Sequence, residues 1–209
     1  MMRNRTTRTA ALGLALGLAV LAPACGGKGE EPREAAPAPR QKEMYEILRE
    51  RVAANPADTD SWFHLADIYE RAGSYDLEIE ALGKVLALTP GRHGAWIKLG
   101  GAYNRLERWQ EAADAYARAR ELRPDDPVLL NNQAYTLGKL GRTAEQIEAL
   151  RRAVERRPSY AAARYNLGVV LLRSGDRAGA ERQLAELRTF DEGAAAALGR
   201  ELGGSGAAR

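Results

Sequence analysis

Four prolines recur at a fixed interval of 34 residues, and this periodicity constrains the fold more than any other feature of the chain. They are Pro56, Pro90, Pro124 and Pro158. A second column with the same interval holds Gly73, Glu107, Gly141 and Gly175. Apolar residues three and four positions apart lie between these columns, which is the spacing of a helix with one buried face. Self-similarity at this period predicts an all-α solenoid of stacked helix pairs, because one pair cannot bury its apolar face alone.

The residues between these prolines resemble the tetratricopeptide repeat. The family motif, W-x2-L-G-x2-Y with a later A-x3-F and a closing proline, is matched by Trp96, Leu99, Gly100, Tyr103, Ala112, Tyr116 (in place of Phe) and Pro124. The same pattern extends over four units, residues 59–92, 93–126, 127–160 and 161–192, the last of which lacks the proline. The resemblance implies a tetratricopeptide-repeat solenoid of about four helix-turn-helix repeats plus a partial N-terminal unit, a single helix, at residues 41–56.

Two further columns bear on how the helices pack. The column Ala66, Gly100, Ala134, Gly168 is small throughout and lets two helices approach closely. Its expected neighbours Ala112 and Ala180 are also small, whereas Glu78 and Gln146 are polar. At those two units we expect a looser helix crossing or polar groups that bend out to water. In a column otherwise occupied by leucine, Gln133 indicates either weak packing or a contact.

The first 24 residues have the pattern of a secretory signal peptide. Arg3, Arg5 and Arg8 precede an apolar run of about twelve residues, which is too short for a membrane span of roughly 20. No two arginines are adjacent there, which disfavours the twin-arginine route.

The run ends at Cys25, the single cysteine of the chain. With the small Ala24 before it, this segment resembles the lipobox of bacterial lipoproteins, whose cysteine receives a diacylglycerol and becomes the mature N-terminus. Ala22 departs from the leucine that the family prefers, and plain cleavage after Ala24 remains the alternative. Residues 25–40, rich in Gly, Pro and charge, would then form a lipidated cysteine and a flexible tether.

At the other end, residues 193–209 are assigned to a capping helix and a disordered tail. The helix would begin close to residue 191 and present Ala195, Leu198 and Leu202 to the end of the solenoid.

Composition excludes several classes of function. The chain has 31 basic and 28 acidic residues, and removing the three arginines of residues 1–24 leaves 28 against 28. The basic pI therefore supports no nucleic-acid partner. One cysteine and two histidines disfavour a metal site. No nucleophile accompanies the His64–Asp67 pair, His93 is expected to be a solvated loop residue, and we predict neither enzyme activity nor a cofactor.

The family resemblance implies a ligand groove lined by the first helix of each unit. The columns expected to face it hold Phe63, His64, Asp67, Ile97, Lys98, Asn104, Arg105, Asn131, Asn132, Tyr135, Lys139, Tyr165, Asn166 and Arg173. Three of these, with Arg71, form a basic column that helix C-termini also favour for reasons unrelated to a ligand. Repeats that clamp the C-terminal carboxylate of cytosolic chaperones carry Lys and Asn where this chain has Phe63 and Asp67, so that function is excluded. On the convex side we expect a salt-bridged, solvated surface from Arg151, Arg152, Arg156 and Arg157.

These patterns predict a membrane-tethered adaptor or assembly factor of the bacterial cell envelope. It would face the periplasm from the outer membrane, be anchored through its N-terminal lipid, and bind an extended segment or helix of another envelope protein. A soluble periplasmic accessory subunit or chaperone is the alternative, and an enzyme is the third and least supported one. The sequence makes no prediction about oligomeric state.

Overall fold

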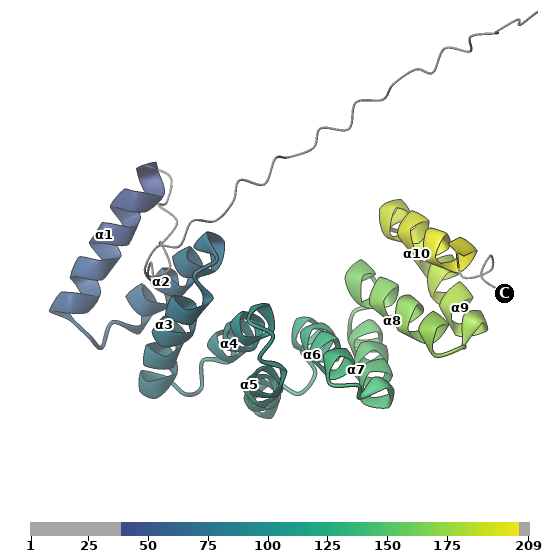
Figure 1. Ribbon diagram of the computed structural model, residues 1–209, viewed down its shortest axis with the longest axis horizontal. Helices are drawn as coiled ribbons and strands as arrows, with labels where there is room; N and C mark the ends of the chain where they lie inside the picture. Colours follow the sequence, from purple (N-terminus) through teal and green to yellow (C-terminus); the bar gives the residue numbers. More distant parts are fainter. Residues whose placement is uncertain (1–38, 205–209) are drawn as a thin grey trace, which may run out of the picture. The chain divides into compact units, whose positions relative to one another are not determined.

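The computed structural model describes residues 39–204, which form ten helices and no strand (Figure 1). The helices are α1 (Pro39–Ala54), α2 (Thr59–Ala72), α3 (Tyr75–Leu88), α4 (His93–Arg105), α5 (Trp109–Leu122), α6 (Pro127–Lys139), α7 (Thr143–Arg156), α8 (Ala161–Arg173), α9 (Arg177–Leu187) and α10 (Glu192–Gly204). The predicted all-α solenoid is thereby confirmed. Residues 1–38, with the predicted signal peptide, Cys25 and most of the tether, and residues 205–209 of the predicted tail lie outside the described residues.

The helices of residues 39–204 form one row, in which each packs against its neighbours in sequence. The four pairs are α2/α3, α4/α5, α6/α7 and α8/α9, with α1 packed on α2 at one end and α10 packed on α8 and α9 at the other. The row curves so that α4 and α6 lie on its inner side and α5 and α7 on its outer side (Figure 1). We call the side formed by α2, α4, α6 and α8 the inner surface. Within the described part, no helix has the length and apolar character needed to cross a membrane.

The two periodic columns lie where the chain changes direction. Gly73, Gly141 and Gly175 have φ of 73°, 73° and 90°, in the left-handed region that glycine adopts freely after a helix. In the fourth member of the column, Glu107 adopts φ 57° despite its side chain. Each proline stands two residues beyond the end of α1, α3, α5 or α7.

The following helix is bonded to the proline turn in three of the four units. The indole nitrogens of Trp62 and Trp96 donate to the carbonyl oxygens of Pro56 and Pro90, at 3.0 and 2.8 Å. In the last unit Arg164 occupies the same column and its Nε donates to Pro158 at 2.6 Å. The turn thereby fixes where each new pair begins.

The small column is needed for close packing. A Cβ atom on Gly100 would lie 2.6 Å from a ring carbon of Tyr116, a residue that is 1% exposed. At Gly168 the nearest atoms belong to Leu198 of α10. Both glycines therefore admit large buried side chains rather than another helix backbone.

Several expectations are corrected by the structure. Glu78 does not bend out to water but is 2% exposed, because α2 and α4 cover it on the first turn of α3. Gln146 is half-buried over Gly138. His93 is not a loop residue: it begins α4 and is 7% exposed, with Nδ1 3.9 Å from Asp126 Oδ2, and its burial lowers its pKa.

The two ends also differ slightly from expectation. Helix α1 begins at Pro39, two residues inside the predicted tether, and α10 continues through Gly204, two residues into the predicted tail. Ala195, Leu198 and Leu202 of α10 are buried against the last repeat.

Candidate functional site

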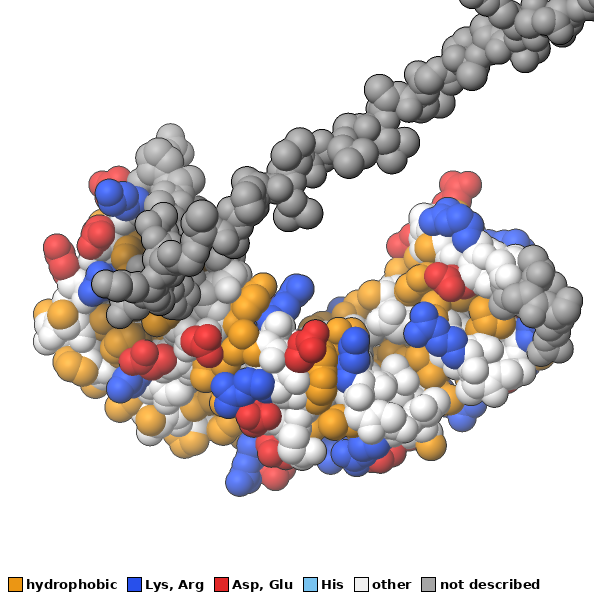
Figure 2. Space-filling model, in the orientation of Figure 1, with side chains coloured by type: hydrophobic (Ala, Val, Ile, Leu, Met, Phe, Trp, Pro, Cys, Tyr) orange, Lys and Arg blue, Asp and Glu red, His pale blue; other side chains and the backbone are white. Residues whose placement is uncertain are grey.

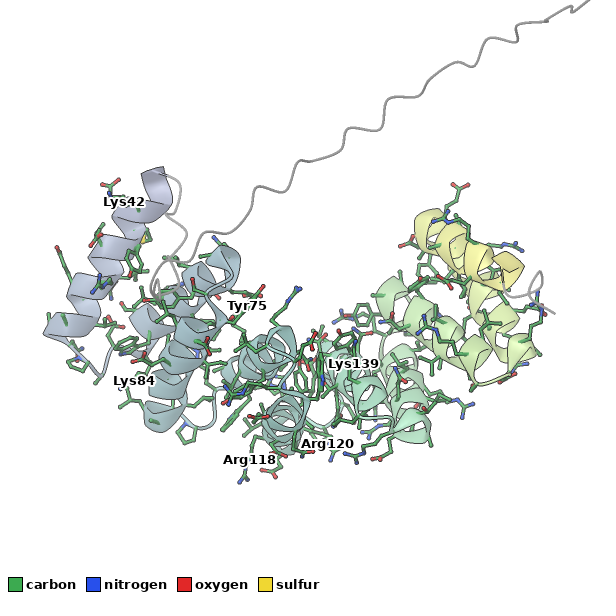
Figure 3. The ribbon with its side chains drawn as sticks, in the orientation of Figure 1. Lys42, Tyr75, Lys84, Arg118, Arg120 and Lys139 are labelled. Carbon is green, nitrogen blue, oxygen red and sulfur yellow. The ribbon has the colours of Figure 1, made fainter. Side chains whose placement is uncertain are left out.

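Two hollows open on the inner surface, and they share one residue, Tyr135. The first has a volume of about 420 Å³ and is called the Glu78 hollow; its lining consists of Glu70, Tyr75, Glu78, Gly101, Ala102, Asn104, Arg105, Tyr116, Asn132 and Tyr135. The second, the Gln146 hollow, has a volume of about 490 Å³; its lining consists of Tyr135, Gly138, Lys139, Thr143, Gln146, Val170, Arg173 and Ser174. Figure 3 shows Tyr75 and Lys139 on the inner side of the row, with Arg118 and Arg120 on the outer side. Apolar, acidic and basic side chains alternate along this part of the molecule (Figure 2).

The two hollows are the same place in the repeat, two repeat lengths apart. Their corresponding residues are Glu70 and Gly138, Tyr75 and Thr143, Glu78 and Gln146, Ala102 and Val170, and Arg105 and Arg173. Because the helix pairs repeat, each hollow is bounded by the end of one first helix, the start of its second helix and the next first helix.

The corresponding position of the repeat between the two hollows is occupied by Trp109, Tyr135 and Lys139, which we call the aromatic wall. The rings of Trp109 and Tyr135 meet edge to face with centroids 6.0 Å apart. Lys139 places its Nζ 5.3 Å from the Trp109 ring and 5.6 Å from the Tyr135 ring. Tyr135 is nevertheless 51% exposed, so the wall presents an aromatic side chain to whatever lies in either hollow.

A hydrogen-bond network of largely buried side chains lies next to the aromatic wall. The Asn104 amide nitrogen donates to the Tyr116 hydroxyl at 3.2 Å, and the Thr136 hydroxyl donates to Asn104 Oδ1 at 2.9 Å. Burial raises the pKa of Tyr116, so this hydroxyl stays protonated. Asn104 was predicted to contact a ligand, but it also joins α4, α5 and α6.

The Glu78 hollow contains a buried carboxyl group. Burial, followed by the negative charge of Glu70, raises the pKa of Glu78 to about 7. Its Oε2 accepts no hydrogen bond within the described part of the chain. Next to it, Lys98 Nζ lies 2.8 Å from Asp67 Oδ1 and 2.6 Å from Glu70 Oε2. Lys98 thus belongs to an ion-pair cluster and does not neutralise Glu78 directly.

Of the predicted groove residues, six line the hollows: Asn104, Arg105, Asn132, Tyr135, Lys139 and Arg173. The others are partly or fully exposed and lie outside these two linings. Phe63 lies under the Arg92 guanidinium at 4.1 Å, and the exposed His64 has Nδ1 3.9 Å from Asp67. Asn166 donates to Asn131 at 2.9 Å. Ile97 and Tyr165 are partly exposed and pack against buried clusters with the rest of their surface.

Sequence reasoning missed the contribution of the second helices. Tyr75, Trp109 and Thr143 each stand at the start of a second helix, 34 residues apart, and each reaches the inner surface. The 34-residue periodicity contains this column. Glu78 and Gln146 were predicted only to depart from the small-residue packing rule, although polar residues that alternate with Ala112 and Ala180 in one column also indicate a polar surface site.

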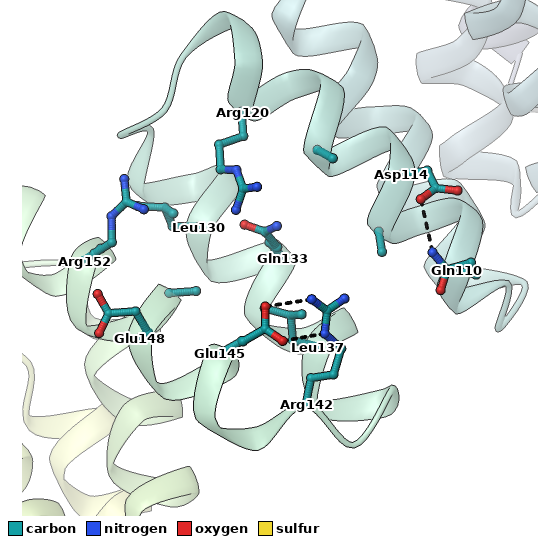
Figure 4. A pocket seen from close by; sticks show the side chains of 13 residues that line it. Gln110, Asp114, Arg120, Leu130, Gln133, Leu137, Arg142, Glu145, Glu148 and Arg152 are labelled. Atoms are coloured by element: carbon teal, nitrogen blue, oxygen red, sulfur yellow. Dashed lines mark hydrogen bonds and ion pairs between the residues drawn. The ribbon is translucent and has the colours of Figure 1, made fainter.

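A third hollow, of about 270 Å³, lies between α5 and α7 with α6 as its floor (Figure 4). Gln133, 8% exposed, lines it together with Arg120, so the departure from leucine in this column borders an outer surface. Arg142 and Glu145 in this lining are paired with each other through two bonds of 2.6 and 2.7 Å, and Arg152 is paired with Asp125.

Two of the four arginines of the convex basic cluster form ion pairs with described residues. Arg152 and Arg156 each approach Asp125 at 2.7 Å. Their shared partner, Asp125, lies in the turn between α5 and α6. Within residues 39–204, no group of three or more His, Cys, Asp and Glu side chains is placed to hold a metal ion.

Helix pairs in one row, with a left-handed turn in each and an inner surface of hollows, define a helical-repeat solenoid. A family model described as tetratricopeptide repeat matches residues 42–93, 79–127 and 131–195. The chain belongs to the tetratricopeptide-repeat family.

Solved structures give the same fold. A crystal structure of MamA superimposes with a TM-score of 0.68 at 22% identity, covering 73% of this chain and 92% of that one. MamA from Desulfovibrio magneticus RS-1 gives a TM-score of 0.67 at 19% identity, covering 73% and 90%. YrrB, described as a TPR protein with an unusual peptide-binding site, gives 0.62 at 19% identity, covering 76% and 91%. No curated protein matches the sequence.

Proposed function

We propose that this protein is a scaffold that holds a segment of another protein on its inner surface, across the two hollows. The observation that carries the proposal is the half-exposed Tyr135, which stands between them with Lys139 and Trp109. Rigid, partly exposed aromatic side chains beside hollows are the anchors that protein interfaces use most.

The repeat geometry suits an extended or helical segment. Equivalent hollows at a fixed interval accept side chains that follow one another along a partner, while the wall between them contacts the partner's backbone. YrrB has the same fold and is described as binding peptide, which supports this use of the fold. Its low sequence identity gives no guide to the partner.

We further propose that the scaffold is tethered to a membrane in the bacterial cell envelope, facing the periplasm from the outer membrane. The support is the order of features in the sequence: a signal-like leader, Cys25 directly after it, and a polar segment before α1. A lipid on Cys25 would contribute roughly 0.8 kcal/mol for each methylene that enters the bilayer.

Site-specific photo-crosslinking in the native cell tests the scaffold. A crosslinking amino acid in place of Tyr135 should give a discrete adduct whose mass identifies the partner. The same amino acid at Arg152, which lines the third hollow between α5 and α7 (the outer hollow), is the control and should give none. Adducts from position 152 alone would move the interface to the outer hollow, and no adduct from either position would contradict the proposal.

The tether is tested by fractionation. The wild-type protein should stay with membranes through high-salt and alkaline washes, and Cys25→Ser should be released. Release of the wild-type protein would instead favour the soluble periplasmic alternative, with cleavage after Ala24.

A further inference from the structure

The Glu78 carboxyl lacks a counter-ion within the described part of the chain. It is 2% exposed, its Oε2 is without a hydrogen-bond donor, and no described Lys or Arg nitrogen lies within ion-pair distance of it. A carboxylate taken out of water without a partner costs several kcal/mol unless it holds its proton. Such a group destabilises the protein that carries it.

The fold does not require this carboxyl. The three equivalent positions of the other repeats hold the neutral residues Ala112, Gln146 and Ala180. Gln146 has nearly the same shape as glutamate and lines the equivalent hollow. A glutamine would therefore satisfy the packing at position 78, and the carboxylate needs an explanation outside folding.

The charges around Glu78 leave room for one more cation. The charged groups that act on it are Asp67 and Glu70 of α2 and Lys98 and Arg105 of α4. With Glu78 ionised, three carboxylates meet two basic groups, and Lys98 already serves Asp67 and Glu70. Arg105 is exposed at the lining of the hollow and forms no ion pair with a described residue.

We propose that the Glu78 hollow is a subsite for a positively charged side chain, a lysine or an arginine, of the partner segment. This inference rests on the proposed scaffold function and names the chemistry of its partner. An ammonium or guanidinium group in the hollow pairs with Glu78, and the side-chain amide of Asn132 offers a further oxygen acceptor in the same lining.

The Gln146 hollow has the opposite character. Its lining includes Lys139 and Arg173 and no carboxylate. A cationic side chain is therefore accepted in one hollow and repelled by the other, which fixes the direction in which a segment lies across Tyr135.

Binding of the cation should depend on pH. The charged form of Glu78 becomes the major one above a pH of about 7, and the groups that act on it are Asp67 and Glu70 of α2 and Lys98 and Arg105 of α4. Affinity for a basic segment should therefore rise several-fold between about pH 6 and pH 8.

A random decapeptide library displayed on phage, selected at pH 8 against the full-length protein in detergent, tests the subsite. Selected peptides should be enriched in Lys or Arg at one position. Replacing that residue by Met in the synthetic peptide should weaken binding at least tenfold to wild type and less than twofold to Glu78→Gln. Glu80→Gln, an exposed carboxylate on the same helix, is the matched control and should behave as wild type.

Gly101→Leu separates failure of the subsite from failure of the scaffold. A Cβ on Gly101 would meet nothing within 4 Å, so the variant should fold while its side chain fills the Glu78 hollow. Gly83→Leu, on α3 and equally unobstructed, is its control. Two results would overturn the cation subsite alone, both for peptides whose binding Gly101→Leu blocks. In the first, these peptides lack a basic residue; in the second, they bind to Glu78→Gln as tightly as to wild type. Peptides that Gly101→Leu does not affect, or a library without binders, would overturn both.

Discussion

The Glu78 hollow and the Gln146 hollow occupy the same position in two repeats, yet they differ in charge. In one, a carboxyl with a raised pKa is buried beside Glu70; in the other, the corresponding residues are Gln146 and Gly138. The arginine that closes each hollow, Arg105 or Arg173, is unchanged. The helix pairs thus determine where a hollow forms, and the residues at two positions determine its charge.

The largest effect should come from removing the charge that distinguishes the hollows. The pKa of Glu78 is raised from 4.5 in the unfolded chain to about 7. Between these values the native state holds a proton that the unfolded state has lost, so the free energy of unfolding falls as pH rises from about 4.5 to about 7. The total loss is about 3 kcal/mol and is complete above pH 7.

Glu78→Gln should abolish this dependence and be the more stable protein at pH 8. Urea unfolding at pH 5 and pH 8, followed by tryptophan fluorescence, measures it, because Trp62, Trp96 and Trp109 all lie in the first two repeats. Glu80→Gln should keep the wild-type profile. Parallel profiles for wild type and Glu78→Gln would contradict the buried, unpaired carboxyl.

The reverse exchange should not reproduce the pH dependence of the first hollow. Gln146→Glu places a half-buried carboxyl beside Lys139 and Arg173, whose positive charges favour its ionised form, so the variant should gain about 1 kcal/mol over wild type at both pH 5 and pH 8. Urea unfolding followed by circular dichroism at the two pH values measures the difference. A loss of stability confined to pH 8 would mean that burial outweighs the two basic residues and that the two hollows have the same electrostatic character.

The open space in the Glu78 hollow can be tested without disturbing its charges. Gly101→Ala adds a methyl group where nothing lies within 4 Å, so it should stabilise the helix by about 0.5–1 kcal/mol, as Gly83→Ala should on α3. Equal shifts in urea midpoint are expected for the two variants. A loss of stability confined to Gly101→Ala would show that the hollow closes in solution.

The smallest effect is expected at the wall between the hollows. Lys139→Met keeps the length of the side chain but removes the cation from the Trp109 and Tyr135 rings, at a cost of about 0.5 kcal/mol. A change in Trp109 fluorescence with a small shift in urea midpoint is the expected result. The same Lys139→Met change made in a Tyr135→Ala background should give neither the shift nor the fluorescence change. If both persisted there, Lys139, Trp109 and Tyr135 would not be energetically coupled.

The fold was predictable because it depends on residues that repeat. The prolines, the left-handed column and the small column each recur every 34 residues, so the helix boundaries and the row of pairs follow from periodicity. Glu107 could be assigned to a left-handed turn only because its column is otherwise glycine.

The hollows were less accessible to sequence reasoning, for a physical reason. The first helices were expected to supply the whole groove, and six of their residues do line the hollows. Whether Glu78 points to water or into the protein depends on how α2 and α4 cover it, and how much of Ile97 and Tyr165 stays exposed depends on how they pack against the buried clusters. Side-chain depth is set by the helix crossing, which a linear pattern does not contain.

The left-handed residue between α4 and α5 has a further consequence. Gly73, Gly141 and Gly175 reverse the chain without a steric penalty, whereas Glu107 has a Cβ that costs about 1 kcal/mol in this conformation. In a linear array each pair is supported only by its neighbours, so resistance to local opening varies along the row. The second repeat, which contains Trp109 of the aromatic wall, is therefore expected to open locally more easily than its neighbours. A bound segment that contacts both hollows would stabilise the second repeat against this opening.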